Sequence, residues 1–235
     1  MEATLETEPI AAAWIPPEPQ CDHGEIVRAL RLFHHSGEPF EIRILHDGNR
    51  TSAGYFNDCN IAADAVVAYD RKRSPKGIYH VLNVVNPGLF ARSPNRITDG
   101  LKPVTSDEEI VLRRVLLVDL DPDRESETSS TDEELQSAVE ASEAVREFLR
   151  RWGFPECVHA ISGNGVHLLT PMEMPNDEPS RQACRSLLNL LKDRQSQFVT
   201  DGRPPVKIDI SVHNASRICR LYGTPARKGI HSADR

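Results

Sequence analysis

The chain has 235 residues, and its 28 Lys and Arg against 35 Asp and Glu give a formal net charge of -7 at pH 7. Hydrophobic residues make up 39% of the sequence and charged residues 27%, a composition typical of a soluble globular protein. No apolar run reaches the roughly 18 residues that a membrane helix needs, and the N-terminus lacks the pattern of a signal peptide, so we expect a cytoplasmic protein without a membrane partner. The five cysteines are scattered and form no CxxC pair, which argues against a disulfide framework and a cysteine-built zinc site.

The first half of the chain alternates between helical and extended patterns. Residues 1–22 are rich in Pro, Glu and Ala, as is typical of a disordered tail. Apolar residues at helical spacing predict an amphipathic helix in 23–36, and a second helix is expected in 57–71. Alternating apolar residues predict strands at 40–45, 51–56 and 77–86.

The second half of the chain contains the clearest helix, in residues 129–154. A cap at Ser130 or Thr131, acids in the first turn and Gly153 as the stop define its ends. Another amphipathic helix is expected in 180–198. The expected strands, of which the second and third form a hairpin, are 115–121, 157–162, 165–171, 206–212 and 217–223. Interleaved strands and helices with hairpins predict an α+β fold with a mixed or antiparallel sheet.

An apolar strand that ends in alternating aspartates is the first candidate functional motif. In the segment VLLVDLDPDR, the strand from Val115 leads to Asp119, Asp121 and Asp123. Because side chains two apart on a strand point the same way, Asp119 and Asp121 share one face. Such carboxylates repel each other unless a cation lies between them, and hard oxygen ligands suit Mg²⁺ or Mn²⁺. The alternative is a strand that runs out into an acidic loop, where we place Asp123.

A glycine-rich turn in the expected hairpin is the second motif. It reads SGNGVHLL and begins at Ser162. Glycines on both sides of Asn164 allow positive φ angles and a close approach to a ligand, and exposed amides in such a turn can bind phosphate. His167 could donate to a triphosphate oxygen, or it could be an ordinary polar residue of a half-buried sheet. His159, on the preceding strand, we interpret as structural.

The third motif, KIDISVHNASRICRLYGTPARKG, lies near the end of the chain. Asp209 is a lone acid on an expected short strand and a third candidate metal ligand. Arg220 and Lys228 could neutralise phosphate charge during a transfer reaction. Arg217 and Arg220 are three residues apart and cannot both be assigned to one strand face, and either could instead be a surface residue paired with a glutamate.

Charge is segregated along the chain. Between residues 119 and 134 there are eight acids and one base, whereas between 203 and 228 there are six bases and one acid. A further basic cluster, RKRSPKG, covers residues 71–77. Such segregation suits a protein that holds metal ions in one place and phosphates in another, although solvated surface loops would produce the same pattern.

The three motifs, taken in order, resemble those of the archaeo-eukaryotic primase superfamily, which are hDhD, sxH and hD. The resemblance covers residues 116–121, 162–167 and 209–229 with specific residues and extends more loosely over 25–95. The residues within these motifs are most similar to those of the primase-polymerases of plasmids, phages and CRISPR-associated loci. The fold implied by the resemblance is a small N-terminal α/β unit packed on an RRM-like catalytic unit, with the active site in the cleft between them. We therefore expect a domain of 23–235 with units of about 23–105 and 106–235.

The resemblance implies a role for each motif residue. The ligands of two divalent cations, Mg²⁺ or Mn²⁺, would be Asp119, Asp121 and Asp209. The residues at the triphosphate of the incoming nucleotide would be Ser162, Asn164, His167, Arg217, Arg220 and Lys228. The residues expected to contact a DNA template through its phosphates are Arg71, Lys72, Arg73 and Lys76, with Arg92 and Arg96 as further candidates.

The implied activity is that of a DNA-templated primase-polymerase. Such an enzyme transfers a nucleotide from an NTP or dNTP to the 3′-hydroxyl of a nucleotide or primer on single-stranded or primed DNA and releases pyrophosphate. A metal-dependent nuclease or phosphodiesterase would also use clustered aspartates and a histidine, but RxxRxxGT with the glycine-rich turn favours a triphosphate substrate. A third hypothesis is a non-catalytic nucleic-acid-binding module on the same fold, but the presence of all three acids and the histidine argues against it. Relatives of this kind often continue past the third motif, so further C-terminal domains of a longer parent chain are expected as potential partners.

Overall fold

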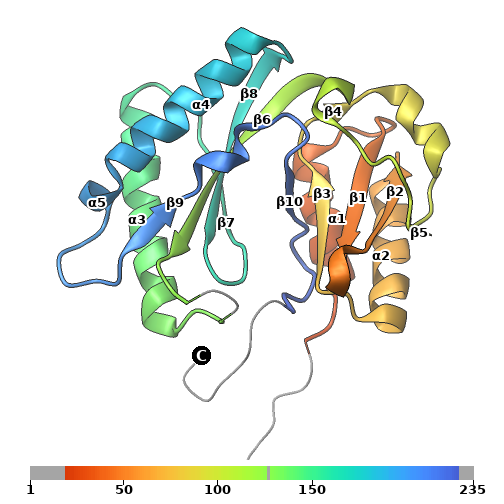
Figure 1. Ribbon diagram of the computed structural model, residues 1–235, viewed down its shortest axis with the longest axis horizontal. Helices are drawn as coiled ribbons and strands as arrows, with labels where there is room; N and C mark the ends of the chain where they lie inside the picture. The colour runs from red at the N-terminus through yellow and green to blue at the C-terminus, as the bar shows by residue number, and fades with distance from the viewer. Residues whose placement is uncertain (1–18, 126–127, 228–235) are drawn as a thin grey trace, which may run out of the picture.

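The structure is a computed structural model that describes residues 19–125 and 128–227. Two five-stranded sheets lie side by side, and each carries helices on one face (Figure 1). All pairs of neighbouring strands are antiparallel, which confirms the expected α+β class. Most of the predicted tail, residues 1–18, lies outside the described residues. Of the helices described, none is both long and apolar enough to cross a membrane.

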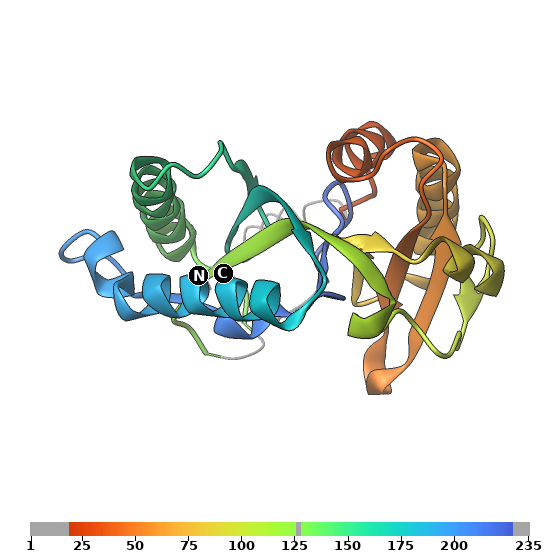
Figure 2. The same ribbon diagram turned by 90° about the horizontal axis from the view of Figure 1, so that it is seen from above.

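The first sheet has the strand order β10-β3-β1-β2-β5. Its strands are β1 (Phe40–Leu45), β2 (Thr51–Phe56), β3 (Gly77–Val81), β5 (Thr98–Asp99) and β10 (Ile218–Arg220). Helices α1 (His23–Phe33) and α2 (Cys59–Arg73) pack together on one face of this sheet (Figure 2). The side chains of Asp22 and Asp58 accept hydrogen bonds from amides in the first turns of α1 and α2, so a polar residue ahead of each helical pattern starts the helix.

The second sheet follows a β-α-β-β-α-β scheme with the strand order β9-β6-β8-β7. Its strands are β6 (Ile110–Pro122), β7 (Val158–Ile161), β8 (Val166–Pro175) and β9 (Val206–Ile208), and the short β4 (Val84–Val85) pairs with the first half of β6. Its helices are α3 (Asp132–Arg151), α4 (Glu178–Asp193) and the short α5 (Gln195–Phe198). This order is the one expected for an RRM-like unit, and it makes β6 the strand between β8 and β9.

Helices α3 and α4 bury their apolar stripes against the same face of the second sheet. Val145 and Leu149 of α3 and Leu188 of α4 share one core with Val118 and Leu120 of β6. Burying each of these side chains contributes roughly 1.5–3 kcal/mol. Because that face is filled by helices, Asp119 and Asp121 of β6 are left on the opposite face, toward the first sheet.

The start of α3 resolves the choice between two expected caps. Thr131 accepts a hydrogen bond from the Glu134 amide, and the Glu134 side chain accepts one from the Thr131 amide. This reciprocal pair is a capping box, which satisfies two helix-end donors at once. Thr131 is therefore the cap rather than Ser130, whose side chain bonds elsewhere.

Several expected strands have other bounds in the structure, and the reason is clear for two of them. The segment 77–86 divides into β3 in the first sheet and β4 in the second, and Asn83 lies between these two strands. Its Oδ1 accepts hydrogen bonds from the amides of Arg114 and Val115, while its Nδ2 donates to the Ala215 carbonyl. The expected strand 206–212 ends at Ile208 because Asp209 caps a 3₁₀ helix, Ile210–His213.

The last strand of the described chain belongs to the first sheet. β10 pairs with β3 in the first sheet, although it follows the strands of the second sheet in the sequence. Phe33, Leu82 and Cys219, which belong to the first unit or its borders, are buried in the core of the second sheet. The two sheets are thus tied together by both the chain path and a shared core, and this brings their facing surfaces close together.

Candidate functional site

The strand order of the second sheet brings the three sequence motifs side by side. Asp119 on β6 lies opposite His167 on β8 in the antiparallel register. On the other side of β6, Leu120 pairs with Ile208 of β9, and the Asp209 amide donates to the Asp119 carbonyl at 3.0 Å. Residues more than forty positions apart in the sequence therefore meet around one aspartate.

These motifs line a hollow of about 320 Å³ between the two sheets, which we call the central hollow. The first unit contributes Leu45 and Tyr79, and the segment around β10 contributes Arg217, Ile218, Arg220 and Ala226. The second sheet and its loops contribute Leu117, Asp119, Asp121, Arg124, Ser162, Asn164, His167, Asp209 and Val212. Every described residue expected at the metal ions or at the triphosphate is thus found on the wall of one cavity.

Asp119 and Asp121 share a face of β6, as the strand period requires. Leu117 lies on the same face, whereas Val118 and Leu120 point into the helix-covered core. The Asp119 side chain is 21% exposed and the Asp121 side chain is 50% exposed. Both carboxylates lie where the apolar strand leaves the core.

Asp123 does not lie with Asp119 and Asp121 at the central hollow. Its carboxylate lies 2.6 Å from the Lys207 ammonium, and its amide donates to the Pro205 carbonyl. It is exposed and does not line the central hollow. The placement agrees with its expected position in a solvated loop.

Asp209 follows β9 directly and faces the central hollow. One of its carboxylate oxygens accepts a hydrogen bond from the Ser211 amide at 2.7 Å, and the other accepts one from the Ser211 hydroxyl at 2.9 Å. Within residues 19–125 and 128–227, no three His, Cys, Asp or Glu side chains are close enough to hold a metal ion. The three carboxylates therefore border the same cavity without forming a closed ligand set.

His167 is held at both ring nitrogens. Its Nδ1 shares a hydrogen bond of 2.8 Å with the Tyr222 hydroxyl, and its Nε2 lies 3.5 Å from Asp119 Oδ1. The Cys219 sulfur is 3.4 Å from Nδ1. Burial alone would lower the pKa of His167, but Cys219 and Asp119 outweigh it and raise this pKa. The imidazole is therefore a proton-bearing group with a defined orientation beside the carboxylates.

The glycine-rich turn packs tightly against β6. A Cβ atom on Gly165 would lie 2.4 Å from both Asp121 Oδ1 and the Leu120 carbonyl oxygen, so only glycine fits there. Gly163 has φ of +115°, which favours glycine. The Ser130 hydroxyl donates to the Asn164 carbonyl at 2.5 Å and anchors the turn to the segment before α3.

Arg217 and Arg220 both reach the central hollow although they flank β10 differently. Arg217 precedes the strand, and its guanidinium donates to Asn214 Oδ1 at 2.9 Å and to the Ser211 carbonyl at 2.6 Å. Arg220 ends the strand, and it donates to the carbonyls of Thr224 and Pro225. Its guanidinium lies 5.9 Å from the Tyr79 ring centroid. Burial lowers the pKa of Arg220, and the main-chain carbonyls fix its direction.

Other expected residues lie elsewhere. Lys228 lies outside the described residues. Of the bases considered for a template, Arg71, Lys72 and Arg73 form the last turn of α2, Lys76 follows it, and none of the four lines the central hollow. Arg92 is paired with Glu109 through two hydrogen bonds, which raise its pKa. His159 bonds to Ser142 of α3 at 2.8 Å, in line with a structural role.

Sequence reasoning missed one basic side chain of this site, Arg124. Arg124 Nη1 lies 3.9 Å from Asp121 Oδ1, and its Nε donates to the Thr128 carbonyl at 3.1 Å. Its position as the single base in an acidic run is a signal that could have identified it. Tyr79 reaches the cavity from the first sheet, and only the packing of the two sheets reveals this.

Comparisons with known proteins add little to this geometry. No family model matches the chain, and no curated protein matches it. A solved structure that is similar to it is the polymerase domain of Mycobacterium tuberculosis Ligase D in complex with DNA. The TM-score is 0.46 and the sequence identity is 16%, over 84% of this chain and 72% of that chain.

Proposed function

We propose that the protein is a template-directed nucleotidyltransferase, a primase-polymerase that joins nucleotides from NTPs or dNTPs to a 3′-hydroxyl and releases pyrophosphate. The observation that carries this proposal is the convergence of three carboxylates, one imidazole and three guanidinium groups on the central hollow. Carboxylates and cations that line one cavity are what a reaction between a hydroxyl and a triphosphate requires. The motif resemblance and the RRM-like strand order support the same proposal.

Asp119, Asp121 and Asp209 are the residues that would hold divalent cations. Their oxygen atoms are the hard ligands that Mg²⁺ and Mn²⁺ prefer, and all three border one cavity. The donor set therefore fits the metal ions in chemistry, although Asp209 would exchange its bonds to Ser211 for a metal bond. Metal ions bound here supply a lowered pKa for the attacking hydroxyl and charge neutralisation for the triphosphate.

The basic side chains of the site would bind and orient the triphosphate. His167 presents a proton-bearing imidazole beside the carboxylates, and its two ring contacts keep it from turning away. Arg220 is held by main-chain carbonyls and Tyr79, so it loses little freedom on binding an anion. Such preorganisation places charge where it develops in the transfer, which is the main contribution of protein side chains to this class of reaction.

One experiment tests the proposal directly. The protein is incubated with single-stranded DNA, Mg²⁺ or Mn²⁺ and labelled nucleotides, and products are followed with time. We expect template-dependent products from the wild type and a loss of at least about 100-fold in the Asp119→Ala and Asp121→Ala variants. Asp123→Ala is the matched control, because this exposed carboxylate is two residues away and lies outside the central hollow.

The outcomes separate the candidate activities. Template-dependent products that persist in Asp123→Ala and vanish in the other two variants support nucleotidyl transfer. Metal-dependent degradation of the DNA would overturn it in favour of a nuclease. Binding of DNA without any metal-dependent chemistry would identify a non-catalytic module.

A further inference from the structure

Two further hollows continue from the central hollow along the first unit. The middle hollow, of about 450 Å³, shares Leu45 and Tyr79 with the central hollow. The outer hollow, of about 520 Å³, shares His46, Arg50 and Thr51 with the middle one. Since each hollow shares wall residues with the next, the middle hollow adjoins both the central and the outer one, and we call the middle and outer hollows the track.

The track is basic in an acidic protein. Its wall includes Arg50, Arg73, Lys76 and Lys102, against the acids Asp47 and Asp99. The four bases come from the turn between β1 and β2, from the end of α2 and just beyond it, and from the segment after β5. In a chain with a net charge of -7, bases from three separate segments converge on two hollows, of which the middle one adjoins the candidate active site.

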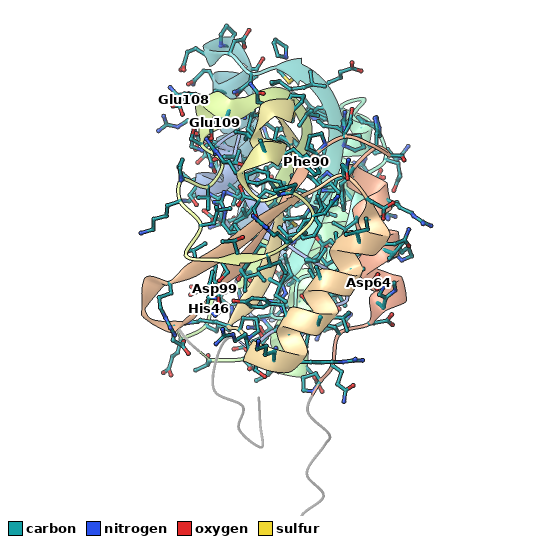
Figure 3. The ribbon with its side chains drawn as sticks, turned by 90° about the vertical axis from the view of Figure 1, so that its right-hand side faces the viewer. His46, Asp64, Phe90, Asp99, Glu108 and Glu109 are labelled. Carbon is teal, nitrogen blue, oxygen red and sulfur yellow. The ribbon has the colours of Figure 1, made fainter. Side chains whose placement is uncertain are left out.

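One of the two acids in the track already has its carboxylate oxygens bound by its neighbours. Asp99 accepts hydrogen bonds from the hydroxyls of Tyr69 at 2.5 Å and Ser52 at 2.8 Å, and it lies 3.2 Å from Arg73. These contacts, the Tyr69 bond first, lower the pKa of Asp99. His46 joins the same group through Ser52 and Tyr69, and Figure 3 shows it next to Asp99 at this edge of the molecule. Asp99 thus serves as a structural part of the wall, while Arg50 and Lys102 remain exposed at its rim.

We propose that the track binds the sugar-phosphate backbone of single-stranded DNA and guides the template strand to the central hollow. Exposed bases along a groove neutralise successive phosphates, and aromatic side chains such as Tyr69 and Tyr79 offer surfaces for unpaired bases. The inference rests on the proposed function, since it names the polymer that the site copies. It also revises which bases serve the template: Arg73 and Lys76 lie on the track, Arg50 and Lys102 join them, and Arg71 and Lys72 do not line it.

Binding of a labelled single-stranded oligodeoxythymidylate, measured by fluorescence anisotropy in a chelator and without nucleotides, tests the track. We expect Arg50→Glu combined with Lys102→Glu to weaken binding by roughly tenfold or more at low salt. The slope of log affinity against log salt should fall by about 1.4, because about 0.7 is lost for each phosphate contact on a single strand. Both residues are exposed, so the variant is expected to unfold at the temperature of the wild type.

The matched control is Arg185→Glu combined with Lys192→Glu. It makes the same change in net charge with the same two residue types, both exposed and both on α4, away from the track. The control should bind DNA within about twofold of the wild type. An equal loss in both variants, or no loss in the track variant, overturns the inference. Equally tight binding of a duplex would overturn the assignment to a single strand.

Failure of the inference and failure of the proposed function give different results. If the wild type makes product and the track variant binds DNA normally, only the track is wrong. If the wild type makes no product but the track variant alone loses DNA affinity, the track stands as a DNA-binding surface and nucleotidyl transfer is wrong. Asp119→Ala should retain DNA affinity in the chelator in either case, because its carboxylate lies outside the track.

Discussion

The Nδ1 atom of His167 and the hydroxyl of Tyr222 lie 2.8 Å apart, and this hydrogen bond joins the second sheet to the segment that follows β10 of the first. The same imidazole faces Asp119 through Nε2. The histidine that is proposed to meet the triphosphate is therefore oriented by residues from both halves of the fold. Tyr222 itself is half-buried beside His167, and burial raises its pKa.

Tyr222→Phe removes this hydrogen bond and the 3.4 Å contact between the Tyr222 hydroxyl and the Cys219 sulfur. A bond of this kind contributes about 1 kcal/mol, so we expect a change of roughly fivefold in the KM for nucleotide or in kcat. Steady-state kinetics on a primed template would measure it, with DNA affinity as an internal control that should not move. Unchanged KM and kcat in a variant of normal thermal stability would show that Tyr222 does not position His167.

His167→Ala should weaken nucleotide binding far more than DNA binding, because its imidazole lines the central hollow and lies outside the track. Titration of the variant with a nucleotide and, separately, with an oligonucleotide would measure both affinities. His159→Ala is the matched control, since that ring bonds to Ser142 at 2.8 Å on the helix side of the neighbouring strand. A nucleotide affinity that His167→Ala leaves unchanged would return this histidine to a purely structural role.

Gly165→Ala should reduce both activity and stability. The added methyl group would meet Asp121 Oδ1 and the Leu120 carbonyl at 2.4 Å, so the turn or the carboxylate must move. Overpacking of this kind typically costs about 1–3 kcal/mol in the free energy of unfolding, which denaturant titration measures. Gly24→Ala is the control, because its nearest neighbour, Asp22 Oδ1, is 3.4 Å away and the position is helical. Equal behaviour of the two variants would contradict the steric argument.

Asp107→Asn should make the free energy of unfolding less dependent on pH in the acid range. Asp107 Oδ1 accepts hydrogen bonds from the amide and the hydroxyl of Ser216, both at 2.7 Å. Burial works to raise the pKa of Asp107, but these bonds outweigh it and lower the pKa. A carboxylate with a lowered pKa in the folded state stabilises the fold above its unfolded pKa of about 3.9, and that contribution is lost as the pH falls through the folded pKa.

Denaturant titration at several pH values tests this prediction. At pH 7 the variant should unfold with a free energy about 1 kcal/mol below that of the wild type. As the pH falls from about 4 through the folded pKa the difference should shrink, because the wild-type carboxyl is protonated first in the unfolded chain and then in the folded protein. A difference that stays constant between pH 7 and pH 3 would rule out this linkage.

Local patterns in the sequence were sufficient for much of this fold. Helix caps, apolar spacing and the turn glycines placed α1, α2, α3 and α4 and the hairpin of β7 and β8 close to their observed bounds. The period of a strand was sufficient to put Asp119 and Asp121 on one face. These features depend on neighbours in the chain, so they can be read without knowing the tertiary structure.

Tertiary structure decided which distant residues meet. Only the order β9-β6-β8 sets Asp209 and His167 on opposite sides of Asp119, and only the return of β10 to the first sheet brings Arg220 over Tyr79. The bases of the track are likewise contributed by three segments that no local pattern connects. The sequence by itself determined the chemistry of each motif through local spacing, whereas long-range strand pairing and the shared core determined the geometry in which those motifs face one another.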